Sequence, residues 1–335
     1  MTMPNDAHDA IETQAADFRA CFDHLKTEIG RVFVGQPELV EQVLVCFFCQ
    51  GHALIEGAPG LGKTLLVKTL CDAVNLRFAR VQCTPDLMPA DVTGTNILVE
   101  TAGGLREFSF QPGPIFANVV LADEINRATP RTQAAFLEAM QERRVTVFGV
   151  SHVIDEPFSV FATENPIEME GTYPLPEAQL DRFFFKLTVR SPGVDDLTEI
   201  MARTTGDREA TVTPKFGADA VRAMLGLIRH VKIADDTTRF VLRIVRATHP
   251  DAAEAPPHVT KYVRYGASPR AAQAIILAAK ALALLAGRYH AAKTDVRRVL
   301  MPALNHRLIL NFQADMDRVT AGAVVEQVLA AVASE

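Results

Sequence analysis

Residues 57–64 read GAPGLGKT, which matches the pattern G-x-x-x-x-G-K-[ST] of loops that bind phosphate groups. The glycines allow the loop to wrap with its N–H groups pointing inward, which forms an anion-binding nest at a helix N-terminus. We expect Lys63 to contact the β- and γ-phosphates of a nucleotide and Thr64 to place its hydroxyl on Mg²⁺. A loop that binds nothing would have no use for Lys63, because a lysine there has no role in a core. The predicted nucleotide-binding residues of this segment are Gly57, Ala58, Pro59, Gly60, Leu61, Gly62, Lys63, Thr64 and Leu65.

Two carboxylates farther along the chain complete this chemistry. An apolar run at 119–122 ends in Asp123 and Glu124. Asp123 would support Mg²⁺ through its water shell, and Glu124 would be the general base that orients or deprotonates an attacking water. A strand that ends in a solvated acidic turn is common, so this pair alone is a weak indicator. After a complete phosphate loop it becomes a strong one, because the chemistry of a Mg²⁺-bound nucleotide needs both parts.

Short apolar runs alternate with helical patterns and would position these residues. This alternation predicts an α/β fold with buried parallel strands. The expected strands are 53–56, 78–82, 119–123, 160–162 and 183–189. Two hairpins are also expected, one pairing 96–99 with 107–110 and one pairing 145–148 with 151–154.

Helical patterns occupy both ends of the chain. Helices are expected at 20–29 and 37–50, and the first seventeen residues are expected to be frayed. After Ser191-Pro192-Gly193 the pattern is helical, at 218–229, 237–248, 269–286, 294–301 and 322–332. Ser268 and Thr294 are the expected N-caps, and 249–265 is an expected exposed loop. The predicted division is a tail and helix (1–30), a nucleotide-binding domain (31–190), a linker (191–214) and a helical domain (215–335).

Composition limits the class of protein. The 335 residues suggest about two domains, and a net charge of −6 argues against a chain built to coat nucleic acid. Five cysteines, an odd and sparse count, fit a reducing, cytoplasmic compartment, and Cys46 and Cys49 are expected to be buried rather than metal ligands. The apolar stretch 271–286 contains Gln273 and Lys280 and is too short to span a membrane, and the polar N-terminus is not a signal peptide.

Several further strings resemble the MoxR-type AAA+ ATPases. They are VGQ at 34–36, QPGPIFAN at 111–118, ADEINRA at 122–128, ATENP at 162–166, GTYPLPEAQLDRF at 171–183 and GASPR at 266–270. The resemblance implies an αβα AAA+ P-loop NTPase core with a parallel five-stranded sheet and a C-terminal all-α lid. It also implies Mg²⁺ and ATP as bound species, rings that are often hexamers, and ATP at subunit interfaces. Such proteins act as chaperone-like remodellers of protein complexes with partners that carry a von Willebrand factor A-type domain.

The resemblance also assigns roles to single residues. Asn165 falls at the sensor-1 position and would bind the γ-phosphate or the attacking water, although an Asn before Pro166 can also simply form a turn. Arg270 matches the sensor-2 arginine, which would reach the γ-phosphate from a lid helix. Arg182 matches the arginine finger offered in trans to a neighbouring subunit. Arg127 and Arg131 are competing choices for that trans contact.

Other matched positions concern the base and the departures from the pattern. Gly35 and Gln36 would lie near the adenine, with Val34 as an apolar wall. Glu164 stands where many relatives carry glutamine, which could slow hydrolysis. The two hairpins match insertions of a wider clade that includes magnesium-chelatase ATPase subunits, and in a ring they could face the pore or the partner.

The sequence leaves three other functions open. A nucleotide-gated scaffold with little turnover draws its support from Glu164. A magnesium-chelatase-like ATPase subunit belongs to the same class as the main interpretation. A nucleic-acid motor finds little support, because basic residues are scattered and no recognition module is appended.

Overall fold

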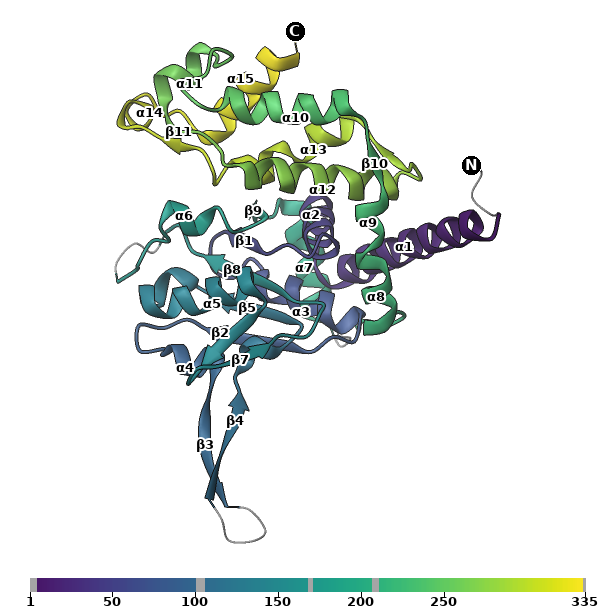
Figure 1. The fold of residues 1–335 in the computed structure, drawn as a ribbon, viewed down its shortest axis with the longest axis vertical. Helices are drawn as coiled ribbons and strands as arrows, with labels where there is room; N and C mark the ends of the chain where they lie inside the picture. The colour runs from purple at the N-terminus through teal and green to yellow at the C-terminus, as the bar shows by residue number, and fades with distance from the viewer. Residues whose placement is uncertain (1–4, 101–105, 168–170, 207–210, 334–335) are drawn as a thin grey trace.

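A five-stranded parallel sheet forms the centre of the computed structural model, which describes residues 5–100, 106–167, 171–206 and 211–333 (Figure 1). The strand order is β2-β5-β8-β1-β9. These strands are β1 (Ala53–Glu56), β2 (Phe78–Gln82), β5 (Val119–Asp123), β8 (Ser159–Glu164) and β9 (Phe185–Thr188). All pairings among them are parallel, which confirms the predicted α/β fold and its strands. The carboxyl ends of β5, β8 and β1 therefore lie side by side at one edge of the sheet.

Helices cover both faces of this sheet, as the alternation of strand residues requires. Val119 and Leu121 of β5 face one hydrophobic core, whereas Val120 and Ala122 face the other. The first core contains α1 (Asn5–Val32), α2 (Pro37–Phe48) and α3 (Lys63–Ala73), and the second contains α5 (Pro130–Glu142). The arrangement is the expected three-layer αβα body.

The N-terminal helix is longer than expected. Helix α1 starts at Asn5 rather than near residue 20, so the expectation of seventeen frayed residues is wrong. Ala15 and Phe18 are fully buried, and the Phe18 ring meets the Phe48 ring edge-on at 5.0 Å between centroids. Packing of α1 against α2 and α3 thus stabilises the helix in a segment whose polar sequence alone predicts no stable helix.

Both predicted hairpins are present. Strands β3 (Gly94–Glu100) and β4 (Arg106–Pro112) pair antiparallel and project from the body in Figure 1, and residues 101–105 between them lie outside the described ranges. Strands β6 (Arg144–Val147) and β7 (Val150–Val153) form the second hairpin. The Phe110 ring stacks on the His152 ring at 3.7 Å, which joins the two hairpins. The remaining short elements of the body are α4 (Pro89–Thr93), η1 (Pro114–Phe116), η2 (Ile125–Arg127) and α6 (Glu177–Leu180).

The C-terminal part is helical, and its residues 235–333 lie above the sheet in Figure 1. Its helices are α7 (Val194–Thr204), α8 (Ala218–Leu225), α9 (Leu227–His230), α10 (Asp235–Ala247), α11 (Pro257–Tyr262), α12 (Pro269–Leu285), α13 (Lys293–Leu304), α14 (Phe312–Met316) and α15 (Ala321–Ala333). Two small ladders join them, β10 (Lys232–Ile233) with β12 (His290–Ala291) and β11 (Val263–Tyr265) with β13 (Ile309–Leu310). The lid is therefore helical with two short ladders rather than free of strands.

Three local expectations for this part are wrong. The segment 191–214 is not merely a linker, because it contains α7. The segment 249–265 is not an exposed loop, since it contains α11 and β11 with Val259 fully buried. Helix α13 is capped at Ala292 rather than Thr294, because the Asp295 side chain accepts from the Ala292 N–H at 2.9 Å. The expected Ser268 cap is confirmed, as its hydroxyl accepts from the Arg270 N–H.

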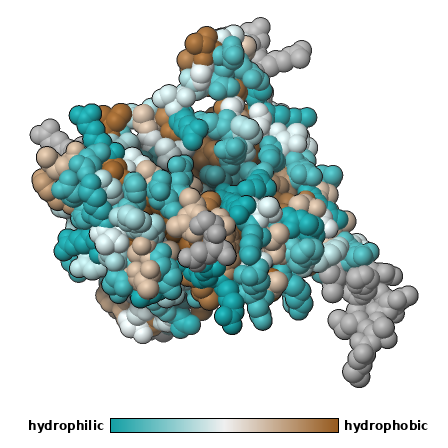
Figure 2. Space-filling model, turned by 90° about the horizontal axis from the view of Figure 1, so that it is seen from above, coloured by the Kyte–Doolittle hydropathy of each residue, from teal (hydrophilic) through white to brown (hydrophobic). Residues whose placement is uncertain are grey.

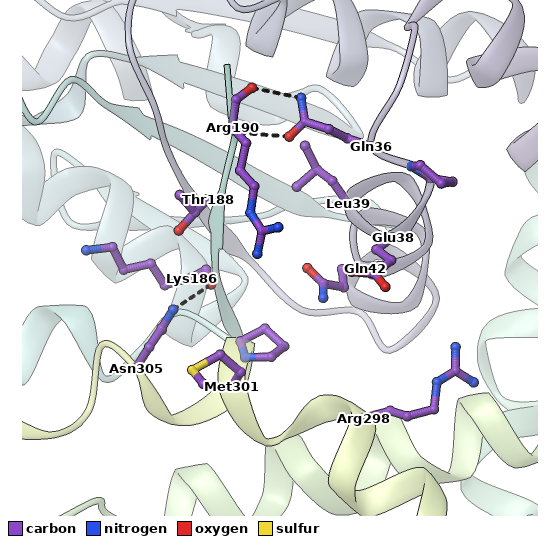
Figure 3. A pocket seen from close by; sticks show the side chains of 12 residues that line it. Gln36, Glu38, Leu39, Gln42, Lys186, Thr188, Arg190, Arg298, Met301 and Asn305 are labelled. Atoms are coloured by element: carbon purple, nitrogen blue, oxygen red, sulfur yellow. Dashed lines mark hydrogen bonds between the residues drawn. The ribbon is translucent and has the colours of Figure 1, made fainter. Parts of the chain in front are cut away.

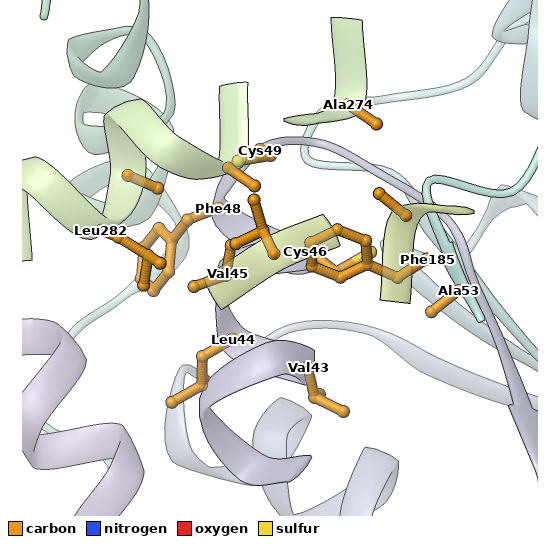
Figure 4. Close-up of a cluster of buried hydrophobic side chains, with 14 of the residues drawn as sticks. Val43, Leu44, Val45, Cys46, Phe48, Cys49, Ala53, Phe185, Ala274 and Leu282 are labelled. Carbon is orange, nitrogen blue, oxygen red and sulfur yellow. The ribbon is translucent and has the colours of Figure 1, made fainter. Parts of the chain in front are cut away.

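One hydrophobic core joins the body to the lid (Figure 4). Cys46 and Cys49 lie in it together with Phe185 of β9 and Leu282 of α12. Both cysteines are buried free thiols, so the C-x-x-C pair belongs to the core, as expected. The position of α12 on the body is thus fixed by packing against α1 and α2.

Seen from the lid side, the surface is largely hydrophilic, with hydrophobic side chains in small separate groups (Figure 2). Within the described part of the chain, no helix has both the length and the apolar character needed to cross a bilayer.

Candidate functional site

The phosphate loop connects β1 to α3 at the carboxyl edge of the sheet. Gly60 and Gly62 have φ angles of 78° and 77°, in the left-handed region that glycine enters without strain. Helix α3 begins at Lys63, so the loop N–H groups lie at a helix N-terminus as predicted. The Lys63 ammonium donates to the carbonyls of Gly57 at 2.5 Å and Ala58 at 2.8 Å. The lysine side chain therefore folds back over its own loop.

Asp123 is the most densely contacted carboxylate of this edge, and it is buried. Its Oδ2 accepts from Thr64 Oγ1 at 3.3 Å and from Arg80 of β2 through Nε at 3.0 Å and Nη2 at 2.6 Å. Its Oδ1 accepts from Thr163 Oγ1 at 2.7 Å, and the same hydroxyl accepts from the Glu124 N–H at 2.8 Å. The structure thus joins the predicted pair Thr64 and Asp123 and adds Arg80 and Thr163, which sequence reasoning missed.

Glu124 is held in a defined position by two side chains. Its backbone lies in the left-handed region with φ 58°, where η2 begins. Its Oε2 accepts from Gln82 Nε2 at 3.2 Å and from Arg127 Nη1 at 3.1 Å. Arg127, one of the expected trans-acting arginines, therefore contacts the carboxylate of its own chain. Gln82 was also missed, although residues 80 and 82 of a strand share one face and could have been grouped.

The charges of this edge bear on the Lys63 ammonium. Burial lowers the pKa of Lys63, and the nearby Asp123 and Glu124 carboxylates act in the opposite direction. The Lys63 ammonium is partly removed from water and lies near two carboxylates. It can therefore exchange its hydrogen bonds to the Gly57 and Ala58 carbonyls for hydrogen bonds to phosphate oxygens.

Asn165 follows β8 at the same edge, between the ends of β5 and β1. Its Oδ1 accepts from the Ile167 N–H at 3.1 Å, but its Nδ2 is buried and has no hydrogen-bond partner among the described residues. A buried donor without a partner costs free energy, so this amide is available to an acceptor oxygen of a ligand. The preceding Glu164 has its pKa raised by burial, with Lys186 opposing the shift.

An apolar cavity of about 570 Å³ adjoins the phosphate loop. Its walls include Val34, Gly62, Leu65 and, from α7, Ile200 and Met201. Such a cavity beside a phosphate loop suits an aromatic base. The wall from α7 was not predicted, because 191–214 was interpreted as a linker. Gly35, beside this cavity, has φ 72°, and a Cβ there would lie 2.9 Å from Asp196, so the close approach of α7 requires glycine.

Gln36 ties this cavity to the edge strand of the sheet. Its Nε2 donates to the Arg190 carbonyl at 3.1 Å and its Oε1 accepts from the Arg190 N–H at 2.8 Å (Figure 3). On the other side of Gln36, α2, β9 and α13 enclose a second cavity of about 570 Å³, which is more polar and is lined by Lys186 and Arg298. Gln36 therefore lies at the boundary between the apolar cavity beside the phosphate loop and the junction of body and lid.

Arg182 and Arg270 do not lie near the phosphate loop of their own chain. Arg182 Nη1 donates to the Leu137 carbonyl at 2.9 Å, and Arg270 Nη1 donates to Asp181 Oδ2 at 3.2 Å. Asp181 lies just before β9, whereas the phosphate loop follows β1, the parallel neighbour of β9. Asp181 and the phosphate loop therefore lie at opposite ends of these two strands. The expectation that Arg270 reaches the γ-phosphate is thus not met within one chain. Arg131 is exposed on α5.

The residues present fit a magnesium ion that a nucleotide brings with it. Across the described ranges, no cluster of three or more histidine, cysteine or acidic residues could hold a metal by protein ligands alone. Mg²⁺ commonly keeps several waters and takes one or two protein oxygens beside substrate phosphates. The Thr64 hydroxyl and the Asp123 carboxylate, next to an anion-binding loop, offer that donor set.

Comparisons with known proteins agree with this geometry. A family model described as "ATPase family associated with various cellular activities (AAA)" matches residues 52–185, and one described as an AAA lid domain matches residues 257–328. Chaperone MoxR1 of Mycobacterium tuberculosis is 43% identical, over 91% of this chain and 80% of that protein. The uncharacterised protein YeaC of Bacillus subtilis is 38% identical, over 91% and 92%. The crystal structure of a candidate ATPase from Cytophaga hutchinsonii superposes with a TM-score of 0.89 at 35% identity, covering 97% of this chain and 98% of that one.

Proposed function

The chain belongs to the MoxR family of AAA ATPases, and from this premise we propose that it hydrolyses Mg²⁺-bound ATP to drive the remodelling of protein complexes. One observation supports the proposal above the others. The phosphate loop, the Asp123–Glu124 pair and the unpartnered Asn165 amide converge at the ends of three adjacent parallel strands. Each supplies a different requirement of phosphoryl transfer, namely anion binding, water activation and contact with the transferred group.

In this proposal the loop N–H groups and Lys63 bind the triphosphate, and the cavity beside α7 takes the adenine. A bound Mg²⁺ would neutralise phosphate charge, with Thr64 and Asp123 on its protein side. Glu124 accepts a proton from the attacking water as its oxygen bonds to the γ-phosphorus and the bond to the bridging oxygen breaks. Before this step the Glu124 carboxylate must leave Gln82 and Arg127, which now hold it. The Asn165 amide donates to the γ-phosphate or to the water.

We further propose that the chain works as a ring, which the family resemblance suggests to be a hexamer. The position of Arg182 and Arg270 supports this, because both lie at the end of the sheet away from their own phosphate loop, so only another subunit would bring a phosphate loop to them. Arginines supplied from outside can raise hydrolysis by roughly 10³–10⁵. The activity per chain should therefore rise with protein concentration in the native protein and stay low at all concentrations in Arg182→Ala. A concentration-independent rate equal in both proteins would contradict the ring.

The expected partner is a protein with a von Willebrand factor A-type domain, acting in the cytoplasm on a client complex. The five free, buried cysteines fit a reducing compartment. Glu124→Gln loaded with ATP should capture the partner, whereas Lys63→Ala, which lacks the phosphate contact, should not. Recovery of no such domain with the ATP-loaded variant, or equal recovery with both variants, would contradict this part of the proposal.

A nucleotide-gated scaffold with little turnover is a second proposal. The contacts of Gln82 and Arg127 with Glu124 favour it, as does the partly buried Glu164 beside Asn165. A scaffold would bind ATP tightly and show no turnover even when assembled with its partner. Comparison of the ATP dissociation constant with steady-state turnover separates the two functions.

A further inference from the structure

One lysine lies beside two neighbouring carboxylates at the carboxyl edge of the sheet. Glu56 is the last residue of β1 and Glu164 is the last residue of β8, and the parallel ladder pairs these two residues directly. Lys186 comes from the edge strand β9, and its Nζ lies 2.9 Å from Glu56 Oε1. A single ammonium therefore faces the negative charge of two adjacent glutamates.

The alternation of strand residues places this group behind the proposed site. Leu54 and Ala162, which stand two residues before the two glutamates, lie in the core that contains α5. Side chains two residues apart on a strand share a face, so both glutamates project on that face as well. Thr163 projects on the opposite face, where its hydroxyl donates to Asp123 at 2.7 Å. The lysine and the glutamates thus lie on the far side of the sheet from Asp123.

The ionisation of Glu164 depends on this lysine. Burial raises the pKa of Glu164, Lys186 lowers it, and the Glu56 carboxylate raises it. Strand β5, the other neighbour of β8, is followed by Glu124, whose carboxylate pairs with Arg127. Two adjacent carboxylates that are partly removed from water repel each other unless a cation lies beside them. Without the ammonium, one of them would take up a proton or move away from the other.

The same strand ends carry residues of the proposed site. The N–H of Gly57, which opens the phosphate loop, donates to the Glu164 carbonyl at 3.2 Å. Asn165, whose amide Nδ2 is buried and has no partner in the described part of the chain, follows Glu164 directly. A change in the spacing of the two strand ends therefore moves the start of the phosphate loop relative to the Asn165 amide.

The lid holds the backbone of Lys186. Asn305, at the end of α13, donates through Nδ2 to the Lys186 carbonyl at 3.2 Å (Figure 3). Burial lowers the pKa of the next residue, His306, so this ring adds no positive charge beside the lysine. Arg190 and Arg298 line the same polar cavity as Lys186, but the ion pair with Glu56 belongs to the lysine.

We propose that Lys186 is a positioning residue for ATP hydrolysis. It offsets the repulsion between Glu56 and Glu164, and it thereby keeps the phosphate loop and the Asn165 amide at the spacing that the reaction needs. This inference rests on the proposed function, because it assigns the lysine a role in that reaction. A misplacement of about 1 Å that originates far from the reacting atoms can slow an enzyme by about 10²-fold.

Steady-state turnover measured as a function of pH tests this role. Lys186→Met keeps a long side chain without charge, and it should match the native protein at about pH 6, where one of the two carboxylates holds a proton. At about pH 9 its turnover should fall to about a tenth of the native value. Lys186→Gln should show the same profile, whereas Lys186→Arg should keep the native one, because a guanidinium also pairs with carboxylates.

Two further variants separate positioning from general damage. Lys293→Met is the matched control, because Lys293 forms an ion pair with Asp236 on the lid, and it should follow the native protein at every pH. In a Glu164→Gln background only one carboxylate remains, so adding Lys186→Met should lower turnover by less than about twofold. All variants are compared at pH values where thermal melting shows them folded. An equal loss with and without Glu164→Gln, or a loss that does not depend on pH, would overturn the proposal.

Nucleotide binding distinguishes a failure of this proposal from a failure of the proposed function. In proteins that carry Glu124→Gln, the ratio of the ADP to the ATP dissociation constant reports contact with the γ-phosphate. Lys186→Met should lower this ratio about threefold at about pH 9 and leave it unchanged at about pH 6. A native protein without ATP turnover would refute the proposed function, but the ratio would still measure the effect of Lys186. An unchanged ratio at both pH values would overturn the positioning role.

Discussion

Arg80 forms an ion pair with Asp123, the carboxylate proposed to support a magnesium-bound nucleotide. Its guanidinium donates through Nε and Nη2 to Asp123 Oδ2, the same oxygen that the Thr64 hydroxyl reaches at 3.3 Å. A metal ion bound at Thr64 and Asp123 would have to displace this cation or share the oxygen with it. We therefore predict that Arg80→Ala lowers the concentration of Mg²⁺ required for tight binding of ATP.

The size of this effect follows from the exposure of the ion pair. The Asp123 side chain is 10% exposed, but the Arg80 side chain is 50% exposed, so solvent screens much of the attraction. Charge-assisted hydrogen bonds contribute about 1.5–3 kcal/mol when they are protected and exposed ion pairs about 0.2–1 kcal/mol. An intermediate value of about 1 kcal/mol corresponds to a roughly fivefold change in an equilibrium constant.

The assay measures the affinity for a fluorescent ATP analogue as a function of Mg²⁺ concentration. All proteins carry Glu124→Gln, so that turnover does not distort the titration. The Mg²⁺ midpoint should fall about fivefold in Arg80→Ala. Arg77→Ala is the matched control, because Arg77 pairs with the exposed Asp155 and does not contact Asp123. An unchanged midpoint would show that Arg80 leaves Asp123 without cost, and a higher midpoint would show that Arg80 itself supports the bound nucleotide. Either result refutes the reasoning.

Three further predictions concern the neighbouring side chains. Burial raises the pKa of Glu164, so its ionised form opposes folding above that raised pKa. Glu164→Gln should therefore raise the free energy of unfolding at pH 7. Denaturant titrations at decreasing pH should show this gain vanish near pH 4.5, the ordinary pKa of a glutamate. Asn165→Ala should lower the free energy of unfolding by only about 1 kcal/mol, the loss of the Oδ1 hydrogen bond with the Ile167 N–H, because Nδ2 has no partner in the described structure. The same variant should lower steady-state turnover by about 10²-fold. Met201→Glu, which places a charge in the wall of the base cavity, should weaken ATP binding by about tenfold and tripolyphosphate binding much less, as competition titrations would show. Equal loss of both ligands in Met201→Glu would contradict the position of the adenine.

The phosphate loop and the acid pair could be predicted from the sequence because their signals are local. The loop 57–64 and the acid pair at 123–124 are each contiguous, and each follows an apolar run that forms the expected strand. Parallel pairing of those strands then brings distant segments to one edge. Arg80 and Gln82 were missed because their role depends on β2 lying beside β5, a pairing that no local pattern specifies.

The parts that depend on contacts between distant segments were predicted less well. Helix α7 has no buried side chain, and it becomes the wall of a cavity only because it lies against the phosphate loop. The position of Arg270 is set by α12 packing on α1 and α2, which places the arginine beside Asp181 instead of beside its own phosphate loop. The motif match correctly placed Arg270 at the start of a lid helix. It could not predict that this helix starts near Asp181, at the end of the sheet away from the phosphate loop.

In the proposed mechanism, Glu124 activates water for attack on ATP bound at the phosphate loop. The most direct test measures ATP affinity and ATP turnover together in the native protein and in Glu124→Gln. The native protein should hydrolyse ATP, and the variant should bind it with a dissociation constant within about threefold of the native value while its turnover falls by about 10²-fold or more. Turnover in Glu124→Gln close to that of the native protein, at equal affinity, would contradict the account.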